Sequence, residues 1–161
     1  MINFCADPHL GHKNIHNFRG FVSSPEDNTS KFLLEASKKL NKRGVTYFLG
    51  DVAFDKESLD LIGGLKGRKI LIKGNHDDKV SSLEQLQVFD EIHGIFKYKK
   101  YWLSHAPIHP HELRGKINLH GHVHNATVKR FGIVDKRYLN LCPDVTGSYF
   151  TSLDEVRTLR A

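Results

Sequence analysis

Residues 45–77 read VTYFLGDVAFDKESLDLIGGLKGRKILIKGNHD and decide the fold class. The apolar, β-branched and aromatic run from Val45 to Leu49 is typical of a strand. Lys56 to Leu65 places its leucines and isoleucine at helical spacing, which predicts a short helix. A second strand is expected over Lys69 to Ile72. The stretch therefore predicts a strand, a helix and a second strand, and both strands lead into glycine followed by polar side chains.

The same alternation continues towards the N-terminus, and strands dominate the second half of the chain. Ile2 to Ala6 reads as a strand, and Ser30 to Arg43 has helical spacing with Gly44 as its expected stop. The remaining expected elements are a capped helix from Ser81, a hairpin within Ile92 to Leu103, a strand over Ile117 to Leu119, two strands within 127–142 and a capped helix from Ser152. The pattern predicts an α/β fold in which two sheets form a β-sandwich flanked by helices. No linker or repeat divides the sequence, so a single domain over residues 1–161 is expected.

The composition is that of an ordinary globular protein, with 39% hydrophobic and 26% charged residues. No apolar run approaches the roughly 18 residues of a membrane span, so we expect no membrane partner. The chain enters a strand directly after Met1 and has two cysteines, so neither a signal peptide nor a disulfide framework is expected. These features predict a cytoplasmic protein. The formal net charge of +6 favours an anionic substrate, but the basic residues are spread along the chain and do not by themselves establish nucleic-acid binding.

Polar clusters stand at or just beyond the ends of the apolar, strand-like runs. The clusters are Asp7-Pro8-His9, Gly50-Asp51, Gly74-Asn75-His76-Asp77, Ser104-His105 and Gly121-His122-Val123-His124. A strand gains little structurally from ending in Asp, Asn or His, whereas a metal centre requires such residues. In α/β sheets, ligands collect beyond the carboxyl ends of the strands. We therefore expect the clusters to meet in one crevice.

The clusters contain enough ligands for two divalent cations. The candidate ligands are carboxylates, an amide and imidazoles, from Asp7, Asp51, Asn75, His9, His105, His122 and His124. A mixed oxygen and nitrogen set suits Mn²⁺, Fe, Zn²⁺ or Co²⁺ better than Ca²⁺, and the lack of cysteine argues against a structural zinc site. One carboxylate must bridge, and Asp51, alone in its cluster, is the natural candidate. Two ions about 3.5–4 Å apart would activate a water between them for in-line attack on phosphorus.

In their order, the clusters resemble the motifs of the calcineurin-like metallophosphoesterases over residues 7–124. The resemblance implies two divalent ions, with Mn²⁺ expected first and Fe, Zn²⁺, Co²⁺ or Ni²⁺ as alternatives. The implied ligands of one ion are Asp7, His9, Asp51 and His124. The implied ligands of the other ion are Asp51, Asn75, His105 and His122. His76 resembles the non-ligand histidine of that family, which contacts the phosphate and protonates the leaving group as a general acid. The length is similar to that of the compact bacterial and phage members.

One position departs from the protein-phosphatase branch of that family. In that branch an Asp lies three residues after the bridging Asp and pairs with the general acid. Here Phe54 occupies this position, and the nearest carboxylate is that of Asp55. The arginines with which that branch grips phosphate are not evident in matching positions either. These differences argue against a protein phosphatase.

Several other polar residues carry open interpretations. His12 and His16 either line the site as phosphate contacts or face solvent, and Arg19 is either a phosphate grip or, by default, a surface arginine. Asp77 is expected to orient its loop through backbone N–H groups. His109 and His111 lie in a loop expected near the site, and His120 is ambiguous. His93 is expected on the surface of a hairpin. Cys5 and Cys142 are expected to be buried thiols.

The sequence thus predicts a binuclear metal-dependent phosphoesterase in which a metal-bridging hydroxide attacks phosphorus and His76 acts as general acid. The expected substrates are small phosphodiesters or nucleotides. Two alternatives stay open, namely a nuclease acting on DNA or RNA and a catalytically silent protein-interaction scaffold of the same fold. Because scaffolds tend to lose ligands and all of the expected ones are present, an enzyme is favoured.

Overall fold

The structure, a computed structural model, describes residues 1–159. Its larger sheet has the strand order β11-β1-β2-β3-β4. β1, β2, β3 and β4 pair in parallel, whereas β11 runs antiparallel to β1. Parallel pairing brings the carboxyl ends of β1, β2 and β3 to one edge of the sheet. The strands are β1 (Ile2–Cys5), β2 (Val45–Phe48), β3 (Arg68–Ile72), β4 (Glu91–His93) and β11 (Thr151–Ser152).

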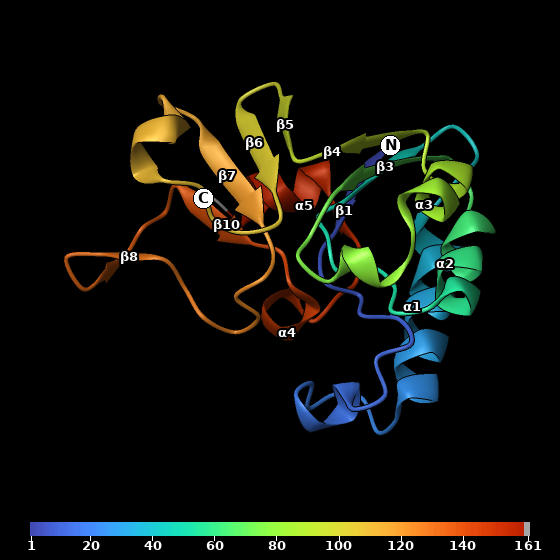
Figure 1. The fold of residues 1–161 in the computed structure, drawn as a ribbon. Coiled ribbons are helices and arrows are strands. Elements are labelled where there is room, and N and C mark those ends of the chain that lie inside the picture. Colours follow the sequence, from blue (N-terminus) through green and yellow to red (C-terminus); the bar gives the residue numbers. More distant parts are fainter. Residues whose placement is uncertain (160–161) are drawn as a thin grey trace.

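Three helices cover one face of this sheet: α1 (Pro25–Lys39), α2 (Lys56–Gly63) and α3 (Ser82–Val88) (Figure 1). Successive strand residues point to opposite faces. Cys5, Phe48 and Leu71 accordingly pack against the helices in one core cluster. Their neighbours Phe4 and Tyr47 belong to a second cluster on the other face. The larger sheet is therefore apolar on both faces, as expected for a central layer.

The second core cluster joins the larger sheet to a smaller one with the order β10-β7-β6-β5. Phe4 and Tyr47 pack there with Tyr101, Leu103 and Leu119 of the smaller sheet. β6, β7 and β10 pair in parallel, and β5 is antiparallel to β6. The strands are β5 (Ile95–Tyr98), β6 (Tyr101–Ser104), β7 (Ile117–His120) and β10 (Tyr138–Asn140). The prediction of a two-sheet α/β sandwich flanked by helices is confirmed.

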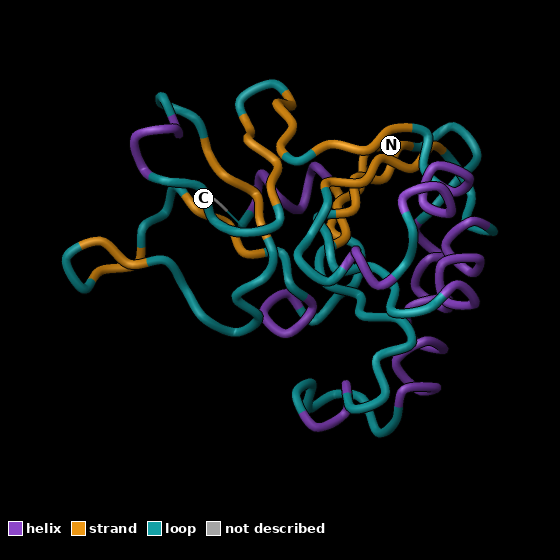
Figure 2. The backbone as a smooth tube through the Cα atoms, viewed as in Figure 1, coloured by secondary structure: helices purple, strands orange, loops and turns teal. Residues whose placement is uncertain are grey.

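Short elements complete the described chain. They are η1 (Ile15–Asn17), η2 (Asp77–Lys79), η3 (Pro110–Leu113), α4 (Pro143–Thr146), α5 (Leu153–Thr158), and the hairpin of β8 (Lys129–Arg130) and β9 (Ile133–Val134). The β8–β9 hairpin stands apart from both sheets (Figure 2). Within residues 1–159, no helix is long and apolar enough to cross a membrane.

Some element boundaries differ from the predicted ones. The helix expected over Ser30 to Arg43 begins at Pro25, because the Ser24 side chain caps it by accepting a hydrogen bond from the Asp27 backbone N–H at 3.1 Å. It ends at Lys39, and Leu40 is already extended, so Gly44 is not its stop. The segment 127–142 holds three strands where two were expected. The capping boxes at Ser81 and Ser152 are both confirmed.

Candidate metal centre

The parallel strand ends bring the first three clusters together. Asp7 follows β1 and Asp51 follows β2, and the backbone N–H of Asp7 donates to the carbonyl of Gly50 at 3.2 Å. The N–H of His9 donates to the carbonyl of Asp51 at 3.1 Å, so pairing continues past the strands. Asn75 follows β3 in the same way. The edge of the larger sheet thus supplies both carboxylates, the amide and one imidazole.

The smaller sheet supplies the other imidazoles from its own strand ends. His105 directly follows β6 and is buried. His122 and His124 lie in the loop after β7, and the backbone N–H of His122 donates to Asp7 Oδ2 at 2.9 Å. That hydrogen bond ties the loop of one sheet to the strand end of the other. The expected convergence of the clusters in one crevice is therefore observed.

The backbone at these ligand candidates is unusual. Five of them have a positive φ, a conformation that side chains bearing a Cβ rarely adopt. The values are 47° for Asp7, 51° for His9, 53° for Asp51, 69° for His122 and 48° for His124. Each such residue costs on the order of 1–3 kcal/mol and is typical of functional sites, where strain aims a side chain. Positive φ thus coincides with five of the seven candidate ligands.

Glycine makes the close approach of the clusters feasible. A Cβ at Gly121 would overlap Asp7 Oδ2 and lie 3.0 Å from the Cβ of Ala6. A Cβ at Gly50 would lie 2.5 Å from His105 Nδ1 and 2.7 Å from the Cα of Gly74. Any larger residue at either position would displace a candidate ligand.

One group of candidate ligands consists of Asp7, His9 and His124, which offer ligand atoms within 4.8 Å of one another. His9 Nε2 lies 3.5 Å from Asp7 Oδ1, and both atoms are buried without a hydrogen-bond partner in the described chain. Burying unpaired polar atoms is costly. A divalent cation would satisfy both at once, so these residues fit a metal ion.

A second group consists of Asp7, Asp51 and His105. His105 Nε2 lies 3.4 Å from Asp51 Oδ2 and 2.9 Å from Asn75 Oδ1, and His122 Nδ1 lies 3.1 Å from the same nitrogen. All four side chains expected at the second ion therefore meet around one atom. Asp51 Oδ2 also lies 3.7 Å from His9 Nε2. Both carboxylates thus lie between the two groups, as a bridging ligand must.

The charges of the site suit a cation. Burial raises the pKa of Asp7, but the neighbouring His9 imidazole and the charge of His105 outweigh burial and hold this pKa below its ordinary value. Burial also raises the pKa of Asp51, but the hydrogen bond and the charge of His105 outweigh burial and lower this pKa. Burial alone would lower the pKa of His105, but the hydrogen bond to Asp51 and the charges of both carboxylates raise it to about 9. Lowered pKa values keep both carboxylates charged at neutral pH, and two negative charges favour a cation at this position.

Two of the imidazoles are oriented by a hydrogen bond at Nδ1. His105 Nδ1 lies 2.8 Å from the carbonyl oxygen of Leu49, and His124 Nδ1 lies 3.3 Å from Asp144 Oδ2. A partner at Nδ1 leaves Nε2 free to act as a ligand and fixes the ring. Asp144, in the first turn of α4, was not identified from the sequence.

Arg19 corrects an expectation, because it is a fully buried residue and not a surface arginine. Its guanidinium donates to the carbonyl oxygens of Asp7 at 2.7 Å and Pro8 at 3.3 Å, and to Asn28 Oδ1 at 3.0 Å. It also pairs with Asp144 at 3.2 Å. Arg19 therefore holds the backbone of the first cluster and the carboxylate that orients an imidazole, and it is not available to grip phosphate.

Asp77 has the structural role that was expected. Its carboxylate accepts backbone hydrogen bonds from Asp51 at 3.0 Å, Val52 at 2.8 Å and Gly74 at 2.6 Å. The two thiols are buried as expected, and Cys142 Sγ additionally lies 3.2 Å from Asp7 Oδ2. These contacts fix the loops that carry the two carboxylates.

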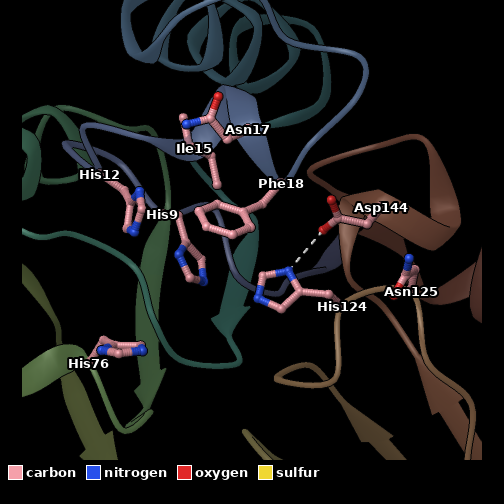
Figure 3. Close-up of a pocket in the computed structure, with 9 residues that line it drawn as sticks. All are labelled: His9, His12, Ile15, Asn17, Phe18, His76, His124, Asn125 and Asp144. Atoms are coloured by element: carbon pink, nitrogen blue, oxygen red, sulfur yellow. Dashed lines mark hydrogen bonds and ion pairs between the residues drawn. The ribbon is translucent and has the colours of Figure 1, made fainter.

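A cavity of about 510 Å³ opens beside the first group. Figure 3 shows His9, His12, His76 and His124 around it, with Phe18 at its side. The full lining is His9, His12, Ile15, Asn17, Phe18, His76, His124, Asn125 and Asp144. His12 therefore lines the site, whereas His16, His93, His109, His111 and His120 are not among the lining residues.

His76 is exposed and faces this cavity without a carboxylate partner. Within residues 1–159 its ring makes no hydrogen bond or ion pair, and it packs on Phe54 with ring centroids 5.4 Å apart. Phe54 also lies 5.3 Å from His9 and 4.8 Å from His12, measured between centroids. The ring of Phe54 thus packs on His76, and Phe54 stands at the position where the protein-phosphatase branch has an Asp.

Comparisons with known proteins agree on the fold. No family model matches the chain. An uncharacterized protein of Methanocaldococcus jannaschii is 26% identical over 95% of this chain and 87% of its own length. A crystal structure of a protein of unknown function from Aquifex aeolicus matches with a TM-score of 0.69 and 26% identity, covering 99% of this chain and 98% of that chain. The crystal structure of the Pseudomonas putida nuclease MPE matches with a TM-score of 0.56 and 20% identity, covering 80% of this chain and 64% of that chain.

Proposed function

We propose that this protein is a metal-dependent phosphoric ester hydrolase of the calcineurin-like type, with two divalent ions held by the seven predicted ligands. The main support is the buried pair formed by Asp7 Oδ1 and His9 Nε2, which have no hydrogen-bond partner among residues 1–159 and which a cation would satisfy together. The surrounding carboxylates and imidazoles supply the hard oxygen and nitrogen ligands that Mn²⁺, Fe, Zn²⁺, Co²⁺ and Ni²⁺ accept. Mn²⁺ is the first ion to test.

The ions, the two carboxylates and the residues that orient the imidazoles have different tasks in this proposal. The bound ions would polarise the phosphoryl oxygens and lower the pKa of a water nucleophile. Asp7 and Asp51 would neutralise the cations, and they lie between both groups. Leu49 and Asp144 hold two imidazoles in the orientation that presents Nε2. This chain therefore provides positioning and electrostatics.

His76 is proposed as the general acid. It lines the same cavity as His9 and His124, so it can reach a phosphate ester bound there. It is not needed as a ligand, and no carboxylate of the described chain engages its ring. An imidazole near neutral pH can donate a proton to a leaving alkoxide. Packing on Phe54 holds the ring towards the cavity.

The proposed substrates are phosphodiesters. No arginine is among the residues that line the cavity in the described chain, and Arg19, which contacts the first cluster, is buried and occupied by protein contacts. A monoester dianion would thus lack a guanidinium partner, whereas a diester carries less charge to neutralise. Small phosphodiesters and nucleotides are the first choice, and a nuclease is the second, favoured by the likeness in fold to the nuclease MPE.

The test is hydrolysis of a chromogenic phosphodiester and of the matching monoester by protein loaded with Mn²⁺. We expect diester turnover that exceeds monoester turnover. His76→Ala should reduce turnover by about 10²–10⁴-fold while the bound metal stays unchanged. His111→Ala, an exposed histidine in η3, is the matched control and should behave as wild type.

Three outcomes would count against the proposal. Folded, metal-loaded wild type that turns over neither ester, nor an oligonucleotide, would favour a silent scaffold. Equal turnover by wild type and His76→Ala would remove the general-acid role. Failure of the wild type to bind two ions, measured by elemental analysis, would contradict the ligand assignment.

A further inference from the structure

The β8–β9 hairpin is an arm outside the metal site. Its strands pair Lys129 with Val134 and Arg130 with Ile133. The turn residues Phe131 and Gly132 have φ of 52° and 80°, as a tight turn with two left-handed residues requires. The arm stands apart from both sheets (Figures 1 and 2). We use the term arm for residues 129–136.

The apolar side chains of the arm are unusually exposed. Phe131 is 91% exposed, Ile133 is 74% exposed and Val134 is 52% exposed. An isolated two-stranded hairpin is at best marginally stable, and exposed apolar groups add nothing to the stability of the fold. Clustered apolar exposure of this kind marks an interaction surface.

The charge of the arm specifies the kind of partner. Lys129, Arg130 and Lys136 are exposed, and none has a carboxylate within 4.0 Å in the part of the chain that the structure describes. Asp135, the acidic residue of the arm, is engaged by Arg137 at 2.6 Å. Two such arms from two copies of the chain would repel each other. The surface therefore complements a polyanion.

The tip adds an aromatic face to this charge. The guanidinium carbon of Arg130 lies 5.3 Å from the centroid of the Phe131 ring. Nucleic-acid surfaces for single strands combine basic groups, which follow the phosphates, with aromatic rings on which bases stack. We propose that the arm binds single-stranded nucleic acid, with Lys129, Arg130 and Lys136 on phosphates and Phe131 stacked on a base.

The arm is anchored to the metal site at its base. Lys129 follows His124 by five positions, so their Cα atoms are at most about 18 Å apart. Asn140, at the end of β10, donates to the carbonyl of His124 at 2.6 Å and to that of Ala126 at 3.1 Å. The base of the arm therefore lies within about 18 Å of a candidate ligand. The inference rests on the proposed function in one respect, namely that the bound strand would be a polymeric phosphodiester substrate for the metal site. Binding of the strand to the arm does not itself require catalysis.

The test measures binding in EDTA, so that a failure of catalysis cannot affect it. Fluorescence anisotropy of labelled single-stranded DNA and RNA oligonucleotides is followed at several salt concentrations. The triple variant Lys129→Ala, Arg130→Ala, Lys136→Ala should bind at least about tenfold more weakly, and the slope of log K against log salt should fall by about 2, since three phosphate contacts are lost. Phe131→Ala should weaken binding about tenfold, and Phe131→Trp should retain it.

A matched control removes the same charges elsewhere. Lys38→Ala, Lys42→Ala, Arg43→Ala changes two lysines and one arginine, exposed and without ion pairs in residues 1–159, around the end of α1. This variant should bind as wild type does. Equal losses in both triple variants, or no binding by wild type at low salt, would overturn the proposal. Binding to anionic lipid vesicles in place of oligonucleotides, or a dimer that depends on the arm, would also overturn it.

Discussion

Arg19→Met is the substitution whose effect on the free energy of unfolding follows most directly from the contacts in the structure. The Arg19 side chain is fully buried and donates to two backbone carbonyls of the first cluster, at Asp7 and Pro8, and to Asn28. It also pairs with Asp144, whose side chain is only 10% exposed. Methionine has similar length and flexibility, so it can fill the space without restoring any of these contacts.

The magnitude follows from the contacts that are lost. Breaking a buried ion pair by removing one partner costs about 3–5 kcal/mol. Burial would raise the pKa of Asp144, but hydrogen bonds from His124 and Arg19 and the charge of Arg19 lower it to about 2 from 3.8. That difference corresponds to about 2 kcal/mol of stability. We expect a total loss of about 3–5 kcal/mol at pH 7, a large part of the 5–15 kcal/mol typical of a domain.

The sign of the pH dependence is fixed. A carboxyl with a lowered pKa in the folded state stabilises the fold above its unfolded pKa, here 3.8. This contribution is lost as the pH falls through about 2, the folded value. The difference between wild type and Arg19→Met should therefore shrink as the pH is lowered from 5 towards 2, by about 2 kcal/mol at most.

The assay is urea unfolding followed by circular dichroism in EDTA, at several pH values. Arg19→Lys keeps the charge but not the fork of donors, and it should fall between wild type and Arg19→Met. Arg157→Met removes an exposed pair with Asp154, so its cost should stay below about 1 kcal/mol. If Arg19→Met unfolded within about 1 kcal/mol of wild type at pH 7, the assigned role of the buried pair would be wrong.

Three further predictions concern the metal centre. The raised pKa of His105, about 9, means that metal binding must release its proton, so affinity should rise about tenfold per pH unit from 7 towards 9; calorimetry in two buffers would count that proton. Gly121→Ala should cost about 1–3 kcal/mol and weaken metal binding, whereas Gly20→Ala, with no atom within 4 Å of the added Cβ, should do neither; equal effects would refute the steric argument. Phe54→Asp would place a carboxylate beside His76, whose charge favours a protonated partner, and should extend activity towards higher pH, with Phe54→Asn as the neutral control.

The sequence predicted the parts of the site that local patterns carry. Strand ends followed by Asp7, Asp51 and Asn75 are visible in the sequence, because the alternation of strands and helices places them at one edge. The glycine at position 121 was likewise expected beside a ligand, and a Cβ there would overlap a carboxylate. What these features share is that the pattern marking each of them, an apolar run followed by glycine or a polar residue, lies within a few residues.

The supporting contacts could not be predicted, because their partners are remote. Arg19 and Asp144 are 125 positions apart and pair through tertiary structure alone. No periodicity distinguishes a buried arginine from a surface one, and the surface is the more common place. The start of α1 at Pro25 was missed for a different reason: the Ser24 cap is local, but the polar first turn hides the helical spacing.

The position of the two sheets relative to each other determines the geometry of the centre. The larger sheet contributes the carboxylates Asp7 and Asp51, and the smaller one contributes His105, His122 and His124. Neither set alone forms a complete pair of ligand groups. The apolar contact between the sheets therefore sets the distance between the two groups of candidate ligands. The hydrogen bond from the His122 backbone N–H to Asp7 Oδ2 holds the loop after β7 against the end of β1. Because packed layers do not deform continuously, the inter-sheet core determines the arrangement of the candidate ligands as much as their own loops do.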